Sequence, residues 1–429
     1  MFYRCRFWRV RFNEWVIRDL QCDNQDAMKS ESFVKAQILS NGITFTGKAL
    51  LLAKNHHAKG QNLCYNLPCV SNALQRPQEL LLVNAEDGYE TVVSCVAPHQ
   101  YRQPLVLDAD NDNFHIRKAN GNFIDNLFID VVPEPGYYKH KLSDGSSARN
   151  YVSACGYDEL NIFPWTGCAI SKHCAFCGIE KVNSLQPKEK TLSAQKLSRD
   201  PGIWKNLAPT YLSKLKEAIQ IAIGDRIYRE HMHLIIISGN LRDDLLDLEA
   251  EIYSQIAQCI APVVAMKATE GIIAVMEPPP SDDKLLLMKE AGIKTVVFNL
   301  EVATEPWASR YCPGKNRLAT NYIMQRLHAA LKIFAPQSVW SNFVMGLEPI
   351  SNLLKACSAL ATEGIVPSAN VFHRDAGSLL HDYNPPTIGE IITFFNKLAS
   401  VYHQTGQRPY YCAKALRTSL TNEAYEGRL

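Results

Sequence analysis

The sequence predicts an α/β fold: a partial (β/α)6 TIM-like barrel, open on one side, that follows a mostly β N-terminal domain. Two observations carry this prediction. From residue 160 to about residue 375, near-continuous apolar runs alternate with stretches of amphipathic helical periodicity. Strands this apolar are typical of a parallel sheet that is buried on both faces. Before residue 150, short β-rich runs alternate with turn-forming residues instead.

Six β/α units are expected in the second part of the chain. The expected strands are residues 160–163, 233–238, 271–276, 295–300, 339–345 and 368–372. The expected helices are residues 207–227, 245–259, 283–291, 320–334 and 353–362, with a further helix at 388–403. In barrels of this kind the chemistry lies at the C-terminal ends of the strands, so residues that directly follow a strand are candidates for the site.

The N-terminal part is expected to form a separate unit of unknown role. Its β-prone runs are residues 42–45, 80–83, 91–96, 104–107 and 127–132. Residues 133–147, rich in Pro, Gly and Ser, form a plausible linker. The predicted division is therefore 1–150 for the N-terminal mostly β domain, 151–385 for the barrel, and 386–429 for a C-terminal helix and tail.

Composition excludes several classes of protein. The chain has 429 residues, and its 45 basic and 43 acidic side chains leave a net charge of only +2, which does not favour a broad nucleic-acid-binding surface. No window reaches the ~18 apolar residues of a membrane span, and the Arg-rich, aromatic start does not resemble a secretory signal. Thirteen cysteines, an odd number, fit a reducing cytoplasm better than a disulfide framework.

Three cysteines lie close together directly after the first predicted barrel strand. Cys168, Cys174 and Cys177 are separated by five and by two residues. Three thiolates in one loop can bind three corners of a [4Fe-4S] cluster, which leaves the fourth iron open to a small molecule. A zinc knuckle or three unrelated buried cysteines are the alternatives. Structural zinc requires four ligands, and the chain has no second C-x2-C pair.

This region resembles the radical S-adenosylmethionine (SAM) superfamily from residue 155 to about residue 380. The common signature of that superfamily is C-x3-C-x2-C, whereas this chain has C-x5-C-x2-C. The longer spacing is also found in the enzymes that build the guanylylpyridinol cofactor of iron hydrogenase. Phe176 matches the aromatic residue that the superfamily places near the adenine, and a plain anchor for the loop is the alternative role.

The resemblance implies SAM contacts at two strand ends. Gly239 and Asn240 follow the second strand, where the superfamily has a Gly-Gly-Glu-like turn, so open carbonyls there would accept from the SAM ammonium; the acidic residue is missing here. Asn299 and Glu301 lie at the end of the fourth strand and resemble the pair that binds the ribose hydroxyls. For Glu301, an acid at a helix N-terminus is the alternative.

Further contacts are implied after the fifth and sixth strands. Gly346 lets a ligand approach closely, and Glu348 orients polar groups around the adenine. Arg374 binds the SAM carboxylate or a substrate anion, with a salt bridge to Asp375 as the alternative.

The implied activity is reductive cleavage of SAM to a 5′-deoxyadenosyl radical that abstracts hydrogen from a small-molecule substrate, in the biosynthesis of a cofactor or natural product. A low-potential electron donor of the flavodoxin or ferredoxin type is the expected partner. Alternatives are a non-catalytic iron–sulfur or zinc protein, and a radical enzyme that modifies a peptide. The late cysteines have no ligand-like spacing, so no second cluster is expected.

Some other residues have open roles. Cys64 and Cys69 are more simply read as ordinary thiols than as metal ligands. The loop that contains Arg310, Lys315 and Arg317 either binds an anionic substrate group or is a solvated connection. In the tail, three side chains are candidates for closing the open side of the barrel: Tyr410, Tyr411 and Arg417.

Overall fold

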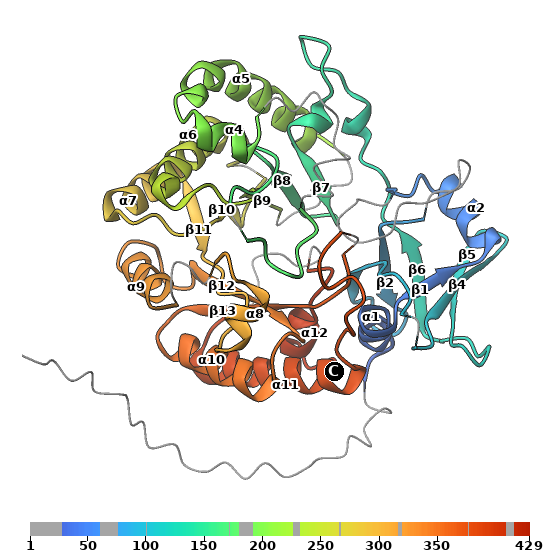
Figure 1. The fold of residues 1–429 in the computed structure, drawn as a ribbon. Coiled ribbons are helices and arrows are strands. Elements are labelled where there is room, and N and C mark those ends of the chain that lie inside the picture. The colour runs from blue at the N-terminus through green and yellow to red at the C-terminus, as the bar shows by residue number, and fades with distance from the viewer. Residues whose placement is uncertain are drawn as a thin grey trace, which may run out of the picture.

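The computed structural model describes residues 28–60, 76–99, 101–170, 172–179, 192–225, 232–265, 267–315, 320–375, 377–408 and 416–429. In these residues one seven-stranded sheet is accompanied by two three-stranded sheets from the N-terminal part of the chain. The large sheet is curled, and most of its helices lie on its outer side (Figure 1). The chain is therefore an α/β protein with a half-barrel.

The strands of the large sheet lie in the order in which they occur in the chain. They are β7 (Ser153–Cys155), β8 (Glu159–Ile162), β9 (His233–Ile237), β10 (Gly271–Val275), β11 (Ile293–Val297), β12 (Val339–Met345) and β13 (Val366–Val371). Neighbours from β8 to β13 pair in parallel, whereas β7 pairs antiparallel with β8. This order results when each β/α unit packs beside the one before it.

Amphipathic helices connect the parallel strands and cover the outside of the sheet (Figure 1). The connecting helices are α5 (Ile203–Ile223), α6 (Leu246–Val264), α7 (Asp282–Glu290), α9 (Thr320–Leu331) and α10 (Ile350–Thr362), and α11 (Ile388–Thr405) follows the last strand, β13. Short helices fill other connections: η2 (Gly136–Lys139), η3 (Ala148–Asn150), α4 (Ala194–Arg199), η4 (Asp243–Leu245), α8 (Trp307–Tyr311) and α12 (Thr421–Tyr425). None of the helices in the described ranges is long and apolar enough to cross a membrane.

The N-terminal part contains two helices that the sequence did not predict. Its sheets are β1–β4–β5 (Ile43–Phe45, Leu105–Asp110, Asn113–Arg117) and β3–β2–β6 (Glu90–Ser94, Glu79–Asn84, Leu127–Val131). The helices α1 (Ser30–Asn41) and α2 (Gly47–Asn55) and the strand β5 were missed. Helix α1 buries Glu31, Ser32 and Lys35 beside its apolar residues, so the sequence lacks the periodicity of an ordinary amphipathic helix.

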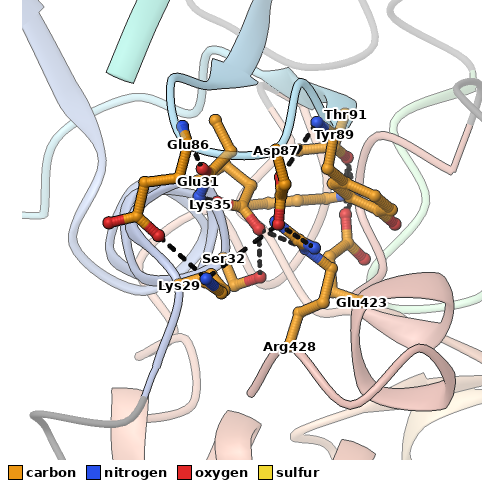
Figure 2. A network of polar contacts seen from close by, with 11 residues as sticks. Lys29, Glu31, Ser32, Lys35, Glu86, Asp87, Tyr89, Thr91, Glu423 and Arg428 are labelled. Atoms are coloured by element: carbon orange, nitrogen blue, oxygen red, sulfur yellow. Dashed lines mark hydrogen bonds and ion pairs between the residues drawn. The ribbon is translucent and has the colours of Figure 1, made fainter. Parts of the chain in front are cut away.

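Buried ion pairs explain how α1 tolerates these polar side chains. Lys35 Nζ lies 2.8 Å from Glu423 Oε1, in α12 near the C-terminal end of the chain, and donates to Thr91 Oγ1 at 2.9 Å. Arg428 Nε donates to Glu31 at 2.6 Å, and the same guanidinium pairs with Asp87 (Figure 2). The last residues of the chain are therefore part of the N-terminal layer.

The C-terminal segment also connects the free edge of the half-barrel to the N-terminal layer. The Val371 N–H of β13 donates to the Thr418 carbonyl at 2.8 Å, and the Ser94 N–H of β3 donates to the Arg417 carbonyl at 3.0 Å. Residues 417–418 thus lie between the last strand of the large sheet and the small sheet β3–β2–β6.

Glu79 completes the connection to the opposite edge of the half-barrel. Its buried carboxylate pairs with Arg417 and, at 2.6 Å, with Lys59, and it accepts from the Gly156 N–H at 3.3 Å. Lys59 also donates to the Ala154 carbonyl of β7 at 3.1 Å. Burial disfavours the carboxylate form, but the two cations outweigh this and lower the pKa of Glu79 to about 2. Glu79 and its partners therefore connect the C-terminal segment with the β7 edge of the half-barrel.

Candidate active site

A cavity of about 640 Å³ lies at the C-terminal ends of the parallel strands. Its walls come from the cysteine loop and from residues that follow β9, β10, β11 and β13. The residues used below are Cys168, Cys174, Phe176, Cys177, Gly239, Asn240, Asn299, Glu301, Lys315 and Asp375. The volume lies within the range of ordinary ligand sites, so the predicted edge of the sheet does carry a ligand-sized cavity.

The three cysteines of the loop all line this cavity. Cys168 and Cys174 are buried and Cys177 is half-buried, and the Cys177 N–H donates to the Cys174 carbonyl at 3.0 Å, which closes a tight turn. Burial raises the pKa of the Cys168 thiol to about 11 and that of Cys177 to about 12. Backbone groups of Ile170 and Asn240 oppose this at Cys168 by hydrogen-bonding its sulfur.

The donor set fits an iron–sulfur cluster. Among the described residues, no three His, Cys, Asp or Glu side chains converge as the ligands of one metal ion would. A [4Fe-4S] cube binds each thiolate to a different iron, so its cysteines do not converge on one point. Cys168, Cys174 and Cys177 line one cavity, and they would hold the cluster.

The turn after β9 fixes the position of the cysteine loop. Trp165 Nε1 donates to the Gly239 carbonyl at 2.6 Å, and the Ala169 N–H donates to the Asn240 carbonyl at 2.7 Å. A Cβ at Gly239 would overlap the Gly167 carbonyl and lie 2.8 Å from Cys168 Cβ. The carbonyls of this turn were predicted to be open to a ligand, whereas both already accept from the loop.

A carboxylate that the sequence did not single out supports this turn. Asn240 Nδ2 donates to Glu277 Oε1 at 2.6 Å, and Glu277 is buried two residues after β10. The turn itself lacks the acidic residue of the Gly-Gly-Glu pattern, so the neighbouring strand end provides a carboxylate at this place. An acid directly after a predicted strand was a signal that could have identified it.

Asn299 and Glu301 lie together on the cavity wall, as the sequence predicts for a pair after one strand. Asn299 Oδ1 accepts from the Asn342 N–H at 3.1 Å. Glu301 has a φ of 64° and pairs through Oε1 with Lys315 Nζ at 2.7 Å. Glu301 is therefore an ion-paired residue of the wall and not a helix N-terminal acid, because the next helix, α8, begins only at Trp307.

Lys315 belongs to a loop that also supports the cysteines. Burial lowers the pKa of its ammonium, but attraction to Glu301 outweighs burial and raises the pKa overall. A Cβ at Gly314 would overlap the Lys172 carbonyl, and the Ala175 N–H donates to the Tyr311 carbonyl at 2.7 Å. The loop after α8 is thus packed on the cysteine loop, which the sequence did not show.

Cys312 is a second residue of this loop in contact with the cysteines. Its side chain hydrogen-bonds to Cys174, which lowers the pKa of Cys174 and raises that of Cys312. The spacing of the late cysteines did not indicate metal ligands, and Cys259 and Cys357 lie on helices apart from the cavity lining. Cys64, Cys69, Tyr410, Tyr411, Cys412 and Arg317 lie outside the described residues.

Gly346 and Glu348 are placed differently from the prediction. Neither is among the described residues that line the cavity. Gly346 has a φ of 109°, and a Cβ there would lie 2.8 Å from Pro386 Cδ, so glycine is required by the backbone and by a protein contact. Glu348 accepts from the Ala303 N–H at 2.5 Å, and burial raises its pKa. Glu348 therefore holds the loop after β11 in place.

Arg374 is also displaced from its predicted role. Its guanidinium donates to the Pro98 carbonyl in the N-terminal part, and it is absent from the described lining of the cavity. Its neighbour Asp375 does line the cavity, and its carboxylate lies 3.2 Å from His373 Nδ1. The alternative of an Arg374–Asp375 salt bridge is therefore not formed either.

Comparison with known proteins gives one curated relative. The chain is 26% identical over 212 residues to bacteriochlorophyllide c C-7(1)-hydroxylase of Chlorobaculum limnaeum, a match that covers 47% of this chain and 52% of that protein. The chain thus aligns with about half the length of this relative. No family model matches.

Solved structures show only a distant likeness. Two are HydG, a maturase of the [FeFe]-hydrogenase, one of them from Carboxydothermus hydrogenoformans; the TM-scores are 0.37 and 0.34, with 14% and 13% identity, and they cover 61% and 60% of this chain and 50% and 53% of theirs. The third is methylornithine synthase, with a TM-score of 0.34, 13% identity and coverage of 61% and 71%.

Proposed function

We propose that this chain is a radical SAM enzyme that acts on a small molecule. The observation that carries the proposal is the position of Cys168, Cys174 and Cys177, which face one ligand-sized cavity at the C-terminal ends of a parallel sheet. Asn299 and Glu301 line the same cavity, as the resemblance to the superfamily implies for a ribose site. The similarity to a hydroxylase over 212 residues supports an enzyme.

The residues of the wall would have distinct tasks. A bound [4Fe-4S] cluster supplies one electron for the cleavage of SAM to a 5′-deoxyadenosyl radical. Asn299 and Glu301 would bind the ribose hydroxyls. The Glu301 carboxylate would then accept hydrogen bonds from the ribose while it remains paired with Lys315. Phe176, which lines the cavity and packs on a small apolar cluster, would contact the adenine and keep water out.

The substrate and the setting of the reaction belong to the proposal as well. The relative is named for hydroxylation of a bacteriochlorophyllide, and we propose a reaction of the same general kind, in the biosynthesis of a cofactor or natural product. A flavodoxin- or ferredoxin-type protein would supply the electron. A reducing, cytoplasmic location would keep the three thiols available.

Anaerobic reconstitution tests the proposal. The full-length chain, loaded with iron and sulfide, should bind about four irons and release 5′-deoxyadenosine from SAM when dithionite is added. Cys174→Ala should abolish both iron binding and cleavage, whereas Cys259→Ala, outside the cavity lining, should retain both.

Two results would contradict the proposal. Cleavage of SAM by the Cys174→Ala protein would show that the ligand assignment is wrong. Stable iron binding without any 5′-deoxyadenosine would favour the non-catalytic metal protein. Glu301→Ala tests the ribose role separately, because it should weaken SAM binding and leave the iron content unchanged.

A further inference from the structure

The cavity has a second end that the cysteines and strand ends do not form. This end is built by residues ahead of β7 and by the N-terminal part of the chain. Residues that line it include Lys59, Gln78, Tyr138, Arg149 and Tyr151. The stretch 133–147, predicted as a linker, is packed here: Tyr137 is buried, and its N–H donates to Asp225 Oδ2 at 2.8 Å.

Arg149 is held at the exposed rim of this second end. Its guanidinium carbon lies 4.6 Å from the centre of the Tyr138 ring, and the side chain is exposed. The Tyr138 hydroxyl accepts from the Ala154 N–H at 3.0 Å, and its ring packs edge-on against Tyr137 at 4.9 Å. A guanidinium stacked on a fixed aromatic ring keeps its N–H edge available for a planar anion.

The charge of Arg149 is uncompensated, in contrast to that of Lys59. Throughout the described part of the chain, no carboxylate pairs with Arg149. Lys59 is 3% exposed, and its ammonium is used by Glu79 and by the Ala154 carbonyl. Among the described residues, the second end of the cavity therefore presents one available cation, which matches a single negative charge. A phosphate dianion carries a second negative charge, which one guanidinium would leave uncompensated.

Aromatic side chains contribute much of the remaining lining of the cavity. They are Tyr138, Tyr151, Phe163, Trp165 and Phe176. Such walls favour a ligand with an apolar, ring-bearing body, whereas the charged group is bound best where it stays partly in water. The described lining thus combines an exposed cation, aromatic side chains and the three cysteines.

We propose that Arg149 determines substrate specificity by binding a carboxylate at the rim, while the apolar body of the substrate extends toward the cysteine loop. The substrate class is therefore a ring-bearing monocarboxylic acid. The substrate role rests on the proposed function, but binding of such an acid requires no radical chemistry.

Equilibrium dialysis of the full-length, reconstituted chain tests this site with two probes, pyrenebutyric acid and the uncharged pyrenebutanol. The wild-type chain should bind the acid about tenfold tighter than the alcohol, because the paired hydrogen bonds between a guanidinium and a carboxylate are stronger than a hydrogen bond to a neutral hydroxyl. Arg149→Gln should remove this preference and leave binding of the alcohol unchanged. Arg149→Lys should restore part of it, since lysine keeps the charge but not the paired donors.

Arg199→Gln is the matched control, because Arg199 is exposed and lies at the end of α4, outside the cavity lining. Equal binding of acid and alcohol by the wild-type chain, or no saturable binding of the acid, would overturn the proposal. Displacement of the acid by inorganic phosphate at lower concentrations than by acetate would overturn the assignment to a carboxylate. Failure of the proposed function would be seen in the reconstitution experiment, as a lack of bound iron or of released 5′-deoxyadenosine.

Discussion

Lys315 Nζ lies 2.7 Å from Glu301 Oε1 in the wall of the cavity, and both side chains are about nine-tenths buried. The pair joins the end of β11 to the loop after α8, which is packed on the cysteine loop through Gly314. One ion pair thus connects the predicted ribose site with the support of the cysteines.

Breaking this pair should destabilise the protein from either side. We expect Glu301→Gln and Lys315→Met each to lower the free energy of unfolding by about 3 kcal/mol, because each leaves its partner charged and buried. The double variant should lose clearly less than the sum, since it leaves no uncompensated charge. Urea denaturation of the four proteins measures this coupling.

The exposed pair Arg242–Asp244 serves as control for this cycle. Its side chains are 50% and 62% exposed, so its removal should change the free energy of unfolding little. Additive effects of Glu301→Gln and Lys315→Met would show that the two charges do not depend on each other.

The periodic part of the fold could be predicted from the sequence, whereas the N-terminal layer could not. β12 occupies residues 339–345 as predicted, because a largely apolar run between helices has few other structures available. Helix α1 was missed because its buried Glu31 and Lys35 are neutralised by Arg428 and Glu423, nearly 400 residues away in the sequence. Local periodicity contains no information about such partners.

The same limit applies to the candidate site. Position after a strand correctly brought Asn299 and Glu301 to the cavity, but Arg374 also follows a strand and turns to Pro98 instead. Because sites in such barrels lie at the C-terminal ends of the strands, the sequence predicts which edge of the sheet carries the site. It does not predict the direction in which a given side chain points. Lys315 was only one of several basic residues in its loop, because its pairing with Glu301 is a tertiary contact.

Glu79 should make stability depend on acid pH. Its pKa is about 2 in the folded chain against an ordinary value of 4.5, so its contribution is present above pH 4.5 and is lost as the pH falls toward 2. We expect Glu79→Gln to cost about 3 kcal/mol of unfolding free energy at neutral pH. The difference from wild type should shrink between pH 4.5 and 2 in urea denaturation.

Glu290→Gln is the control for that experiment, since Glu290 is exposed at the end of α7. Its unfolding free energy should follow that of the wild type at every pH. A difference between wild type and Glu79→Gln that stays constant down to pH 2 would show that Glu79 does not ionise as the ion pairs require.

Gly239→Ala should impair cluster binding and leave the fold intact. The added Cβ would overlap the Gly167 carbonyl, so the cysteine loop has to move away from β9. We expect the iron bound after reconstitution to fall several-fold while the far-UV circular dichroism stays that of the wild type. Gly389→Ala adds the same atom where nothing lies within 4 Å, and it should bind iron normally. Equal iron binding by both variants would show that the loop does not need this contact.

Cys312→Ala should distinguish a neighbour of the cluster from a fourth ligand. Cys312 hydrogen-bonds to Cys174 but is not among the described residues that line the cavity, so we expect the variant to bind as much iron as the wild type and still cleave SAM. The lost hydrogen bond should alter the electronic environment of Cys174, which a shift in the cluster's reduction potential would report. Cys357→Ala, on helix α10 outside the lining, should leave that potential unchanged. If Cys312→Ala loses one iron of four, four thiolates bind the cluster, and no iron is left open to SAM.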